Sequence, residues 1–117
     1  MPHLTIEASK TLKTKIAFNS LTRTLHLSLK GIPDIAMDRL KTRHFFSEAP
    51  VTGEDAKPLK MIHVTLAVLS GRDVETRKSY GARILEALQS AVPKGARKDL
   101  SLTVEVREME REAYFRS

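Results

Sequence analysis

The fold of this chain is decided by its most regular strand, residues 61–69, which read MIHVTLAVL. Apolar and β-branched residues dominate this run, a composition typical of a buried β-strand. Ser70, Gly71 and Arg72 follow as a turn. Asp73 is a good N-cap for the next segment, because its carboxylate can accept a hydrogen bond from the first turn of a helix. The stretch therefore predicts a buried strand that leads directly into a helix.

The helix after Asp73 is predicted by apolar residues at helical spacing, and it ends where Pro93 and Gly95 follow. Residues 100–106 alternate apolar and polar side chains and predict the returning strand. Two strands joined by a crossover helix in one sheet are expected to be parallel, with a right-handed connection. The residues that mark the apolar face of the helix are Val74, Gly81, Ile84, Leu85, Leu88 and Val92.

The first half of the chain repeats this order. Residues 4–8 alternate as a short strand, and the apolar residues within 11–29 recur every four or five positions, which predicts an amphipathic helix. Residues 40–46 predict a second strand, and residues 47–58 lack periodicity and predict a loop. The residues that end or interrupt these elements are Gly31, Pro33, Pro50, Gly53 and Pro58.

The predicted order is therefore β-α-β twice, as one domain over residues 1–117 with pseudo-repeats at 1–48 and 59–110. Four strands with two helices on one face of the sheet make an α/β fold of the two-layer α+β sandwich type. The inner strands carry apolar side chains that we expect on both faces, so the face without helices needs cover. A closed symmetric oligomer is the usual source of such cover.

Composition excludes several classes of protein. None of the 117 residues is Cys, which excludes a disulfide scaffold, a Cys-ligated zinc site and a thiol nucleophile. No run approaches the ~18 apolar residues of a membrane span, and the start lacks the pattern of a signal peptide. We therefore expect a cytoplasmic protein without a membrane partner.

The charge of the chain points to a small anion. Lys and Arg number 20 against 14 Asp and Glu, for a net charge of +6. The basic residues are scattered and no aromatic-rich motif accompanies them, so we expect no nucleic-acid partner. A small anionic substrate would use a few of the same charges.

The histidines and serines predict no further chemistry. No two of the four histidines have the i, i+4 spacing of a helical metal site, so no metal is predicted. His63 falls within the predicted buried strand and is expected to be a core histidine. No nucleophile elbow and no Gly-rich phosphate loop is present.

Pro2 is the residue with unusual chemistry. Initiator Met is commonly removed before a small residue, and proline permits this removal. Pro2 would then be a secondary amine, and an α-amino group has a pKa near about 7.7–8.0 that burial or nearby cations lower further. Such an amine can act as a neutral general base near pH 7. A retained Met1 would leave an amide nitrogen without basicity, and many chains begin with Met-Pro without catalytic meaning.

Three stretches of the sequence carry a family resemblance. Residues 2–9 read PHLTIEAS, residues 63–66 read HVTL before the Gly71-Arg72 turn, and residues 105–108 read EVRE. Together they resemble the tautomerase superfamily and, within it, the 5-carboxymethyl-2-hydroxymuconate isomerases. Residues 61–109 are also similar to a whole subunit of the smaller 4-oxalocrotonate tautomerases, in agreement with the internal repeat.

The resemblance implies a homotrimer of fused β-α-β pairs that interconverts enol and keto forms of a small unsaturated carboxylate, without a cofactor. Pro2 would take a proton from the 2-hydroxy group and return one to carbon. Arg72 would bind a substrate carboxylate and stabilise charge on the dienolate. The structural alternative for Arg72 is an arginine that caps backbone carbonyl groups or pairs with a surface acid.

The second strand departs from the family pattern. Lys41 stands where the family has arginine, and Arg39 and Arg43 lie two residues to either side, which strand alternation places on one face. Lysine is a point charge without the planar fork of arginine. Lys41 and Arg43 are predicted to bind substrate. Two alternatives stay open, a relative with dehalogenase or decarboxylase chemistry and a catalytically silent anion-binding trimer.

Overall fold

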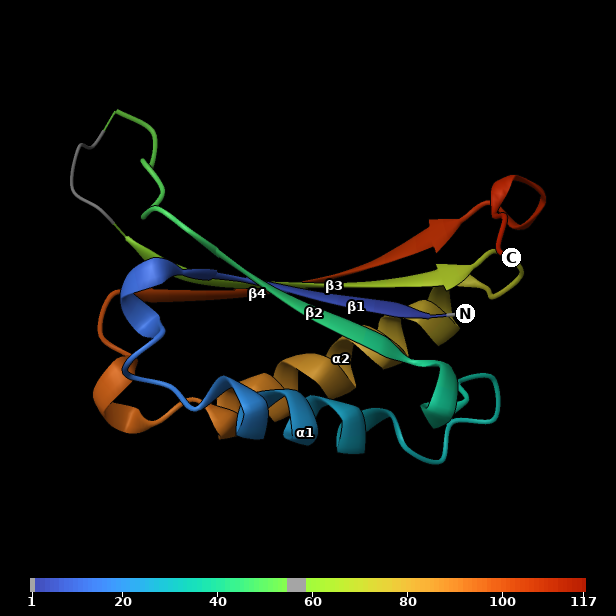
Figure 1. Cartoon of the computed structure of the whole chain (residues 1–117), viewed down its shortest axis with the longest axis horizontal. Coiled ribbons are helices and arrows are strands. Elements are labelled where there is room, and N and C mark those ends of the chain that lie inside the picture. The colour runs from blue at the N-terminus through green and yellow to red at the C-terminus, as the bar shows by residue number, and fades with distance from the viewer. Residues whose placement is uncertain (1, 55–58) are drawn as a thin grey trace.

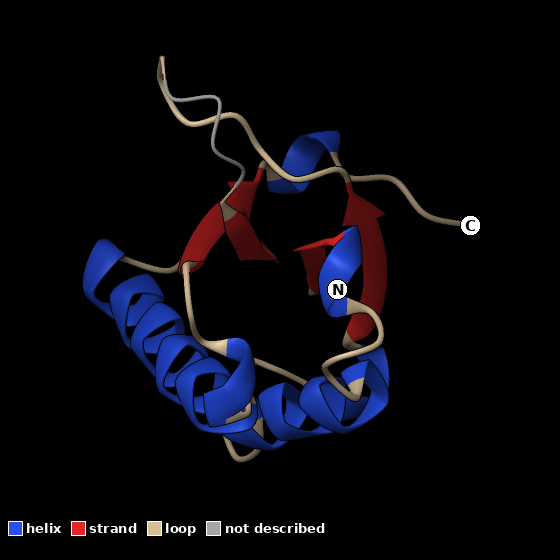
Figure 2. Ribbon diagram, turned by 90° about the vertical axis from the view of Figure 1, so that its left-hand side faces the viewer, coloured by secondary structure: helices blue, strands red, loops and turns tan. Residues whose placement is uncertain are grey.

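The computed structural model describes residues 2–54 and 59–117 and shows one four-stranded sheet packed against two helices (Figures 1 and 2). The strands are β1 (His3–Ser9), β2 (Lys41–Ser47), β3 (Lys60–Leu69) and β4 (Leu100–Met109), and the helices are α1 (Phe18–Leu29) and α2 (Val74–Ala91). Short 3-10 helices span Lys10–Leu12, Met37–Arg39, Lys94–Ala96 and Arg111–Ala113. The predicted two-layer architecture, with both helices on one face, is confirmed.

The sheet has the order β2-β1-β3-β4. β1 is parallel to β2 and β3 is parallel to β4, as the crossover helices require. The two halves meet in the centre, where β1 and β3 are antiparallel and Leu4 lies opposite Leu66. The start of β1 therefore lies beside the end of β3, which brings Pro2 close to the residues that follow Leu69.

The core lies between the sheet and the helices. One face of each inner strand and one stripe of each helix supply large aliphatic side chains that are fully buried, each worth roughly 1.5–3 kcal/mol. These side chains include Leu4, Ile6, Ile62, Val64, Leu66, Leu21, Leu25, Leu29, Ile84 and Leu88. No helix in the described part of the chain is long and apolar enough to cross a bilayer.

Helix α1 begins at Phe18, seven residues later than the expected start at residue 11. Residues 10–12 form a 3-10 helix, and residues 13–17 form an irregular connection. Leu12 and Ile16 are nevertheless buried, because this connection crosses the end of the core between the sheet and the helix layer. The spacing of Leu12 and Ile16 therefore results from their burial in the core and does not indicate a helix.

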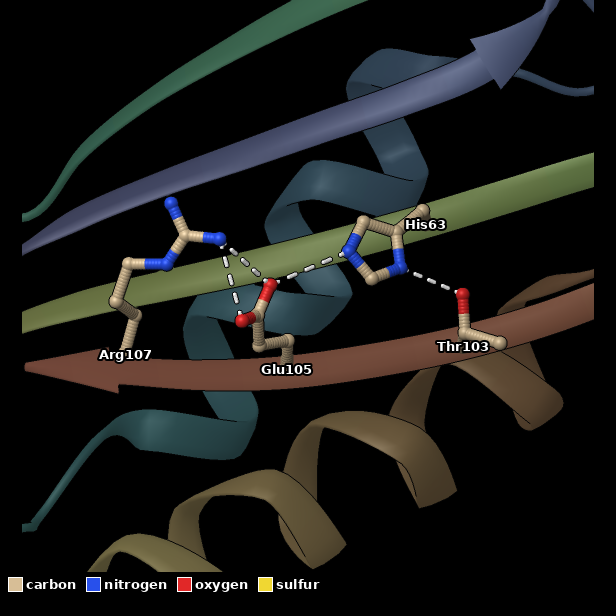
Figure 3. A network of polar contacts seen from close by, with 4 residues as sticks. All are labelled: His63, Thr103, Glu105 and Arg107. Carbon is tan, nitrogen blue, oxygen red and sulfur yellow. Dashed lines mark hydrogen bonds and ion pairs between the residues drawn. The ribbon is translucent and has the colours of Figure 1, made fainter.

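The sheet face without helices is largely polar, contrary to the expectation of apolar residues on both faces. His63 lies on this face with 32% of its side chain exposed, so it is not a core histidine. Its neighbour Val64 points to the opposite face of the sheet and is buried in the core. His63 Nδ1 shares a 2.6 Å hydrogen bond with the Thr103 hydroxyl (Figure 3). Glu105 lies between His63 and Arg107, 3.6 Å from the His63 ring and 3.1 Å from the guanidinium. These polar side chains thus find their hydrogen-bond and ion-pair partners within the chain.

Two partly buried histidines are expected to make stability depend on pH. His26 of α1 contacts the Thr42 hydroxyl of β2 at 2.5 Å, and burial lowers the pKa of His26 below the ordinary 6.5. The pKa of His3 is lowered by burial and then by the cations Arg43 and Lys41. The folded chain therefore binds these protons less tightly than the unfolded chain does. The free energy of unfolding is expected to fall as the pH drops below about 6.5.

Urea unfolding at about pH 7.5 and about pH 5.5, at one protein concentration, measures this dependence. The double variant His3→Gln/His26→Gln is expected to lose less stability between the two pH values than the wild type does. An equal loss in both proteins would show that other groups carry the pH dependence.

Candidate active site

Pro2 lines a small cavity at the end of the sheet where β1 begins and β3 ends. The cavity measures about 190 Å³, below the roughly 300–1,000 Å³ of most ligand pockets, so it suits a small molecule. Pro2 itself is buried, and Arg72 lines the same cavity. The two residues predicted as catalytic are thus brought together. The full lining is Pro2, Asp34, Val68, Leu69, Arg72 and Arg111.

Arg72 is held in place by three hydrogen bonds. Its Nη1 donates to Leu69 O at 2.9 Å, its Nη2 to Asp34 O at 2.7 Å and its Nε to Tyr80 Oη at 3.2 Å. Gly71 has a φ of +123°, a conformation that side-chain-bearing residues rarely adopt, so this turn favours glycine. Arg72 thus caps carbonyl groups, as the structural alternative expects. A guanidinium has five N–H groups, however, so two remain for a ligand.

Arg111 is a second guanidinium at this cavity, and sequence reasoning missed it. Its backbone N–H donates to Ser70 Oγ at 3.1 Å, and its Nη2 donates to Ser70 O at 3.0 Å. No motif or spacing signals this position. Only the pairing of β3 with β4, which ends at Leu69 opposite Met109, brings Arg111 beside the turn of Arg72.

The two guanidiniums at the cavity keep their positive charge uncompensated. Neither Arg72 nor Arg111 forms an ion pair with an acidic side chain of residues 2–54 or 59–117. Two cations beside a small cavity favour an anionic ligand and disfavour a further positive charge there.

Lys41 and Arg43 lie outside this cavity, exposed on the polar face of the edge strand β2. Their partners across the sheet are His3 and Thr5. Arg39 does not share their strand, because it lies in the 3-10 helix before β2. The expectation that alternation places all three cations on one strand face is therefore wrong for Arg39.

His3 joins the chain's last residues to β1. Arg43 Nη1 donates to His3 Nδ1 at 3.1 Å, so the neutral ring carries its proton on Nε2 and donates to Tyr114 Oη at 2.8 Å. The His3 and Tyr114 rings also meet edge to face, with centroids 5.8 Å apart. Because Tyr114 follows Arg111 by three residues, this contact holds the segment that carries Arg111.

A larger hollow of about 550 Å³ lies at the other end of the molecule, between the end of α2 and the start of β4. Arg97, which lines this hollow, caps the carbonyl groups at the end of α2: its Nη2 donates to Gln89 O at 2.6 Å and its Nε donates to Val92 O at 3.2 Å. Across the described ranges, no three possible metal ligands come together. The Pro2 cavity is therefore the candidate active site.

The duplicated β-α-β sheet of this chain is the fold of the tautomerase superfamily, and solved structures of that superfamily match nearly the whole chain. The family model described as 5-carboxymethyl-2-hydroxymuconate isomerase matches residues 2–117. The chain belongs to this family, and so to a family of isomerases.

Three solved structures illustrate the similarity. A 5-carboxymethyl-2-hydroxymuconate isomerase from Deinococcus radiodurans R1 has a TM-score of 0.83 at 23% identity, over 99% of this chain and 88% of that chain. FG41 malonate semialdehyde decarboxylase, inhibited by 3-bromopropiolate, has a TM-score of 0.69 at 15% identity, over 97% of this chain and 88% of that chain. A fused 4-OT described as a wild type symmetric trimer has a TM-score of 0.76 at 16% identity, over 98% of this chain and 91% of that chain. No curated protein matches significantly. At these identities the likeness establishes the fold.

Proposed function

We propose that this protein is a cofactor-independent cytoplasmic tautomerase of aromatic-compound catabolism. Its substrate is a small unsaturated carboxylate like 5-carboxymethyl-2-hydroxymuconate, which it interconverts between enol and keto forms. The observation that carries the proposal is the meeting of Pro2 and Arg72 at one small cavity. Membership of an isomerase family supports the reaction type.

Pro2 is the general base once Met1 has been removed. Burial of Pro2 and the guanidiniums of Arg72 and Arg111 disfavour a protonated amine, so the pKa of the Pro2 nitrogen falls below the usual range of about 7.7–8.0. The neutral amine accepts the proton of the 2-hydroxy group, and the oxygen becomes a carbonyl as the double bond moves. The protonated amine then returns a proton to carbon, so the reaction balances without a co-reactant.

Arg72 binds the carboxylate beside the reacting oxygen. Its two remaining N–H groups stabilise the negative charge that develops on the dienolate. Because hydrogen bonds to Leu69, Asp34 and Tyr80 already fix the guanidinium, little reorganisation is needed when the charge forms.

Lys41 and Arg43 bind substrate at the contact between subunits of a homotrimer. Both side chains are exposed and lie outside the cavity of their own chain. They can contact a substrate only at a site formed where the polar sheet faces of two subunits pack together. Fused 4-OT structures with this fold are described as symmetric and asymmetric trimers, which supports this assembly. Phe45 of the same face is 54% exposed and offers apolar area for the contact.

Light scattering at micromolar concentration is expected to report a trimer of about 39 kDa, from three chains of 13.1 kDa. Phe45→Glu is expected to weaken the trimer, because it places a charge in the contact. Leu27→Glu, at a 60% exposed position on α1, is the matched control and should leave the mass unchanged. A fully active 13.1 kDa monomer would contradict the assembly.

Enol turnover tests the proposed reaction. Protein whose intact mass confirms a Pro2 amino terminus is mixed with 2-hydroxymuconate or phenylenolpyruvate, and ketonisation is followed by absorbance. Acceleration above the buffer rate is expected. If no enol acid reacts faster than in buffer, the tautomerase proposal is wrong. The alternative function is a decarboxylase, because a malonate semialdehyde decarboxylase has the same fold. In that reaction a protonated Pro2 would act as an acid.

A further inference from the structure

The proposed reaction gives Arg111 no contact with the substrate. We propose that Arg111 is a further substrate-binding cation of the Pro2 site, supplied by the same chain as Pro2 and Arg72, and that it holds a second carboxylate of the substrate while Arg72 holds the first. The inference rests on the proposed function for the reaction and on the cavity for the binding.

The position of Arg111 is the first support. Arg111 lines the cavity with Pro2 and Arg72, and its Nη2 donates to Ser70 O at 3.0 Å. A Cβ built on Gly71 would lie only 3.8 Å from the same nitrogen. The Arg111 guanidinium thus lies directly against the turn that carries Arg72, on the rim of the same small space.

The hydrogen-bonding capacity of Arg111 is the second support. Within residues 2–54 and 59–117 its guanidinium donates a single hydrogen bond, to Ser70 O, and has no carboxylate partner. A guanidinium carries five N–H donors, and their fork matches a carboxylate bidentately. Arg111 therefore has more donors to offer a ligand than Arg72, which already donates from all three of its nitrogens.

The third support is the way the segment is fixed. Ser70 N donates to Met109 O at 2.8 Å, and Ser70 Oγ accepts from Arg111 N at 3.1 Å. Three residues later Tyr114 accepts from His3, which directly follows Pro2. The segment is held on both sides of Arg111, so the binding of a carboxylate has little backbone to order.

These features assign the ligand of Arg111. Two guanidiniums at a cavity of about 190 Å³ can hold two carboxylates of one short enol, so an enol with a second carboxylate binds more tightly than a monocarboxylate enol. A monocarboxylate enol needs Arg72 alone. Arg111 then discriminates between the two classes through ground-state binding, and its removal affects KM more than kcat.

Steady-state kinetics of the processed full-length chain test the assignment. Arg111→Ala is expected to raise KM for the dicarboxylate 2-hydroxymuconate roughly 10–100-fold, the range for a lost charged hydrogen bond. KM for the monocarboxylate phenylenolpyruvate should change less than about twofold. Arg111→Lys should recover part of the loss. Arg97→Ala, which removes an arginine at the far end of the molecule, should match the wild type on both substrates.

Calorimetric binding of glutarate, a dicarboxylate that cannot tautomerise, separates this inference from the proposed function. If glutarate binding weakens at least tenfold in Arg111→Ala while no enol is turned over by the wild type, the inference holds and the tautomerase proposal fails. If the wild type turns over enols but Arg111→Ala and Arg111→Lys match it in KM and in glutarate affinity, the inference fails and the proposed function stands. Wild-type protein that neither binds glutarate nor reacts overturns both.

Discussion

A chain with any residue left in front of Pro2 is expected to lose roughly 10³-fold in kcat/KM, within the range that general-base catalysis contributes. Acylation by the preceding residue turns the secondary amine into an amide, which has no basicity. Pro2 is buried and lines the small cavity, so this change falls on the proposed reaction site itself. The measurement compares chains that begin at Pro2 with chains extended by one alanine, each verified by intact mass.

Pro2→Ala is the control for this comparison. Alanine also permits removal of Met1, so the variant begins with a primary amine at the same place and keeps a base of similar pKa. Its kcat/KM should fall between the values for the processed wild type and the extended chain. Full activity in the extended chain would exclude Pro2 as the base.

Arg72→Ala is expected to lower kcat/KM roughly 10²-fold, about 2.7 kcal/mol of transition-state stabilisation. The loss should appear in kcat as well as in KM, because the guanidinium stabilises charge that develops during the reaction. Thermal stability should also fall, since Leu69 O and Asp34 O lose their donor.

Arg97→Ala is the matched control for Arg72→Ala. Arg97 likewise donates to two backbone carbonyls, those of Gln89 and Val92, but lies at the opposite end of the molecule. Its loss should lower thermal stability and leave kcat/KM unchanged. If Arg72→Ala lowers stability without changing kcat/KM, Arg72 has only the structural role.

Most of the fold could be predicted because its signals are local. The apolar, β-branched composition of residues 61–69 places β3 to within one residue, and Asp73 caps α2 by accepting a 2.8 Å hydrogen bond from Thr76 N–H. Tertiary packing decides the rest. β4 continues to Met109, three residues beyond the predicted end, because Leu69 of β3 pairs with it there. Helix α1 begins later than the apolar spacing predicts, because Leu12 and Ile16 are buried by an irregular connection and yet lie four residues apart, as in a helix.

The candidate site could be predicted only in part. Pro2 and Arg72 carry recognisable sequence signals, and the antiparallel pairing of β1 with β3 brings them to one cavity. Arg111 carries no such signal, because a lone arginine after a strand is ordinarily a surface residue. Lys41 and Arg43 lie outside this cavity, and strand alternation alone cannot show which side chains of a strand line a cavity.

The role of Pro2 as the base is tested most directly by the pKa of its nitrogen. Processed chain labelled with ¹⁵N-proline is titrated by NMR, and kcat/KM for 2-hydroxymuconate is measured over the same pH range. We expect both curves to report one pKa, below the ordinary range of about 7.7–8.0, because Pro2 is buried beside Arg72 and Arg111. A Pro2 nitrogen that does not titrate where kcat/KM changes would contradict its role as the base.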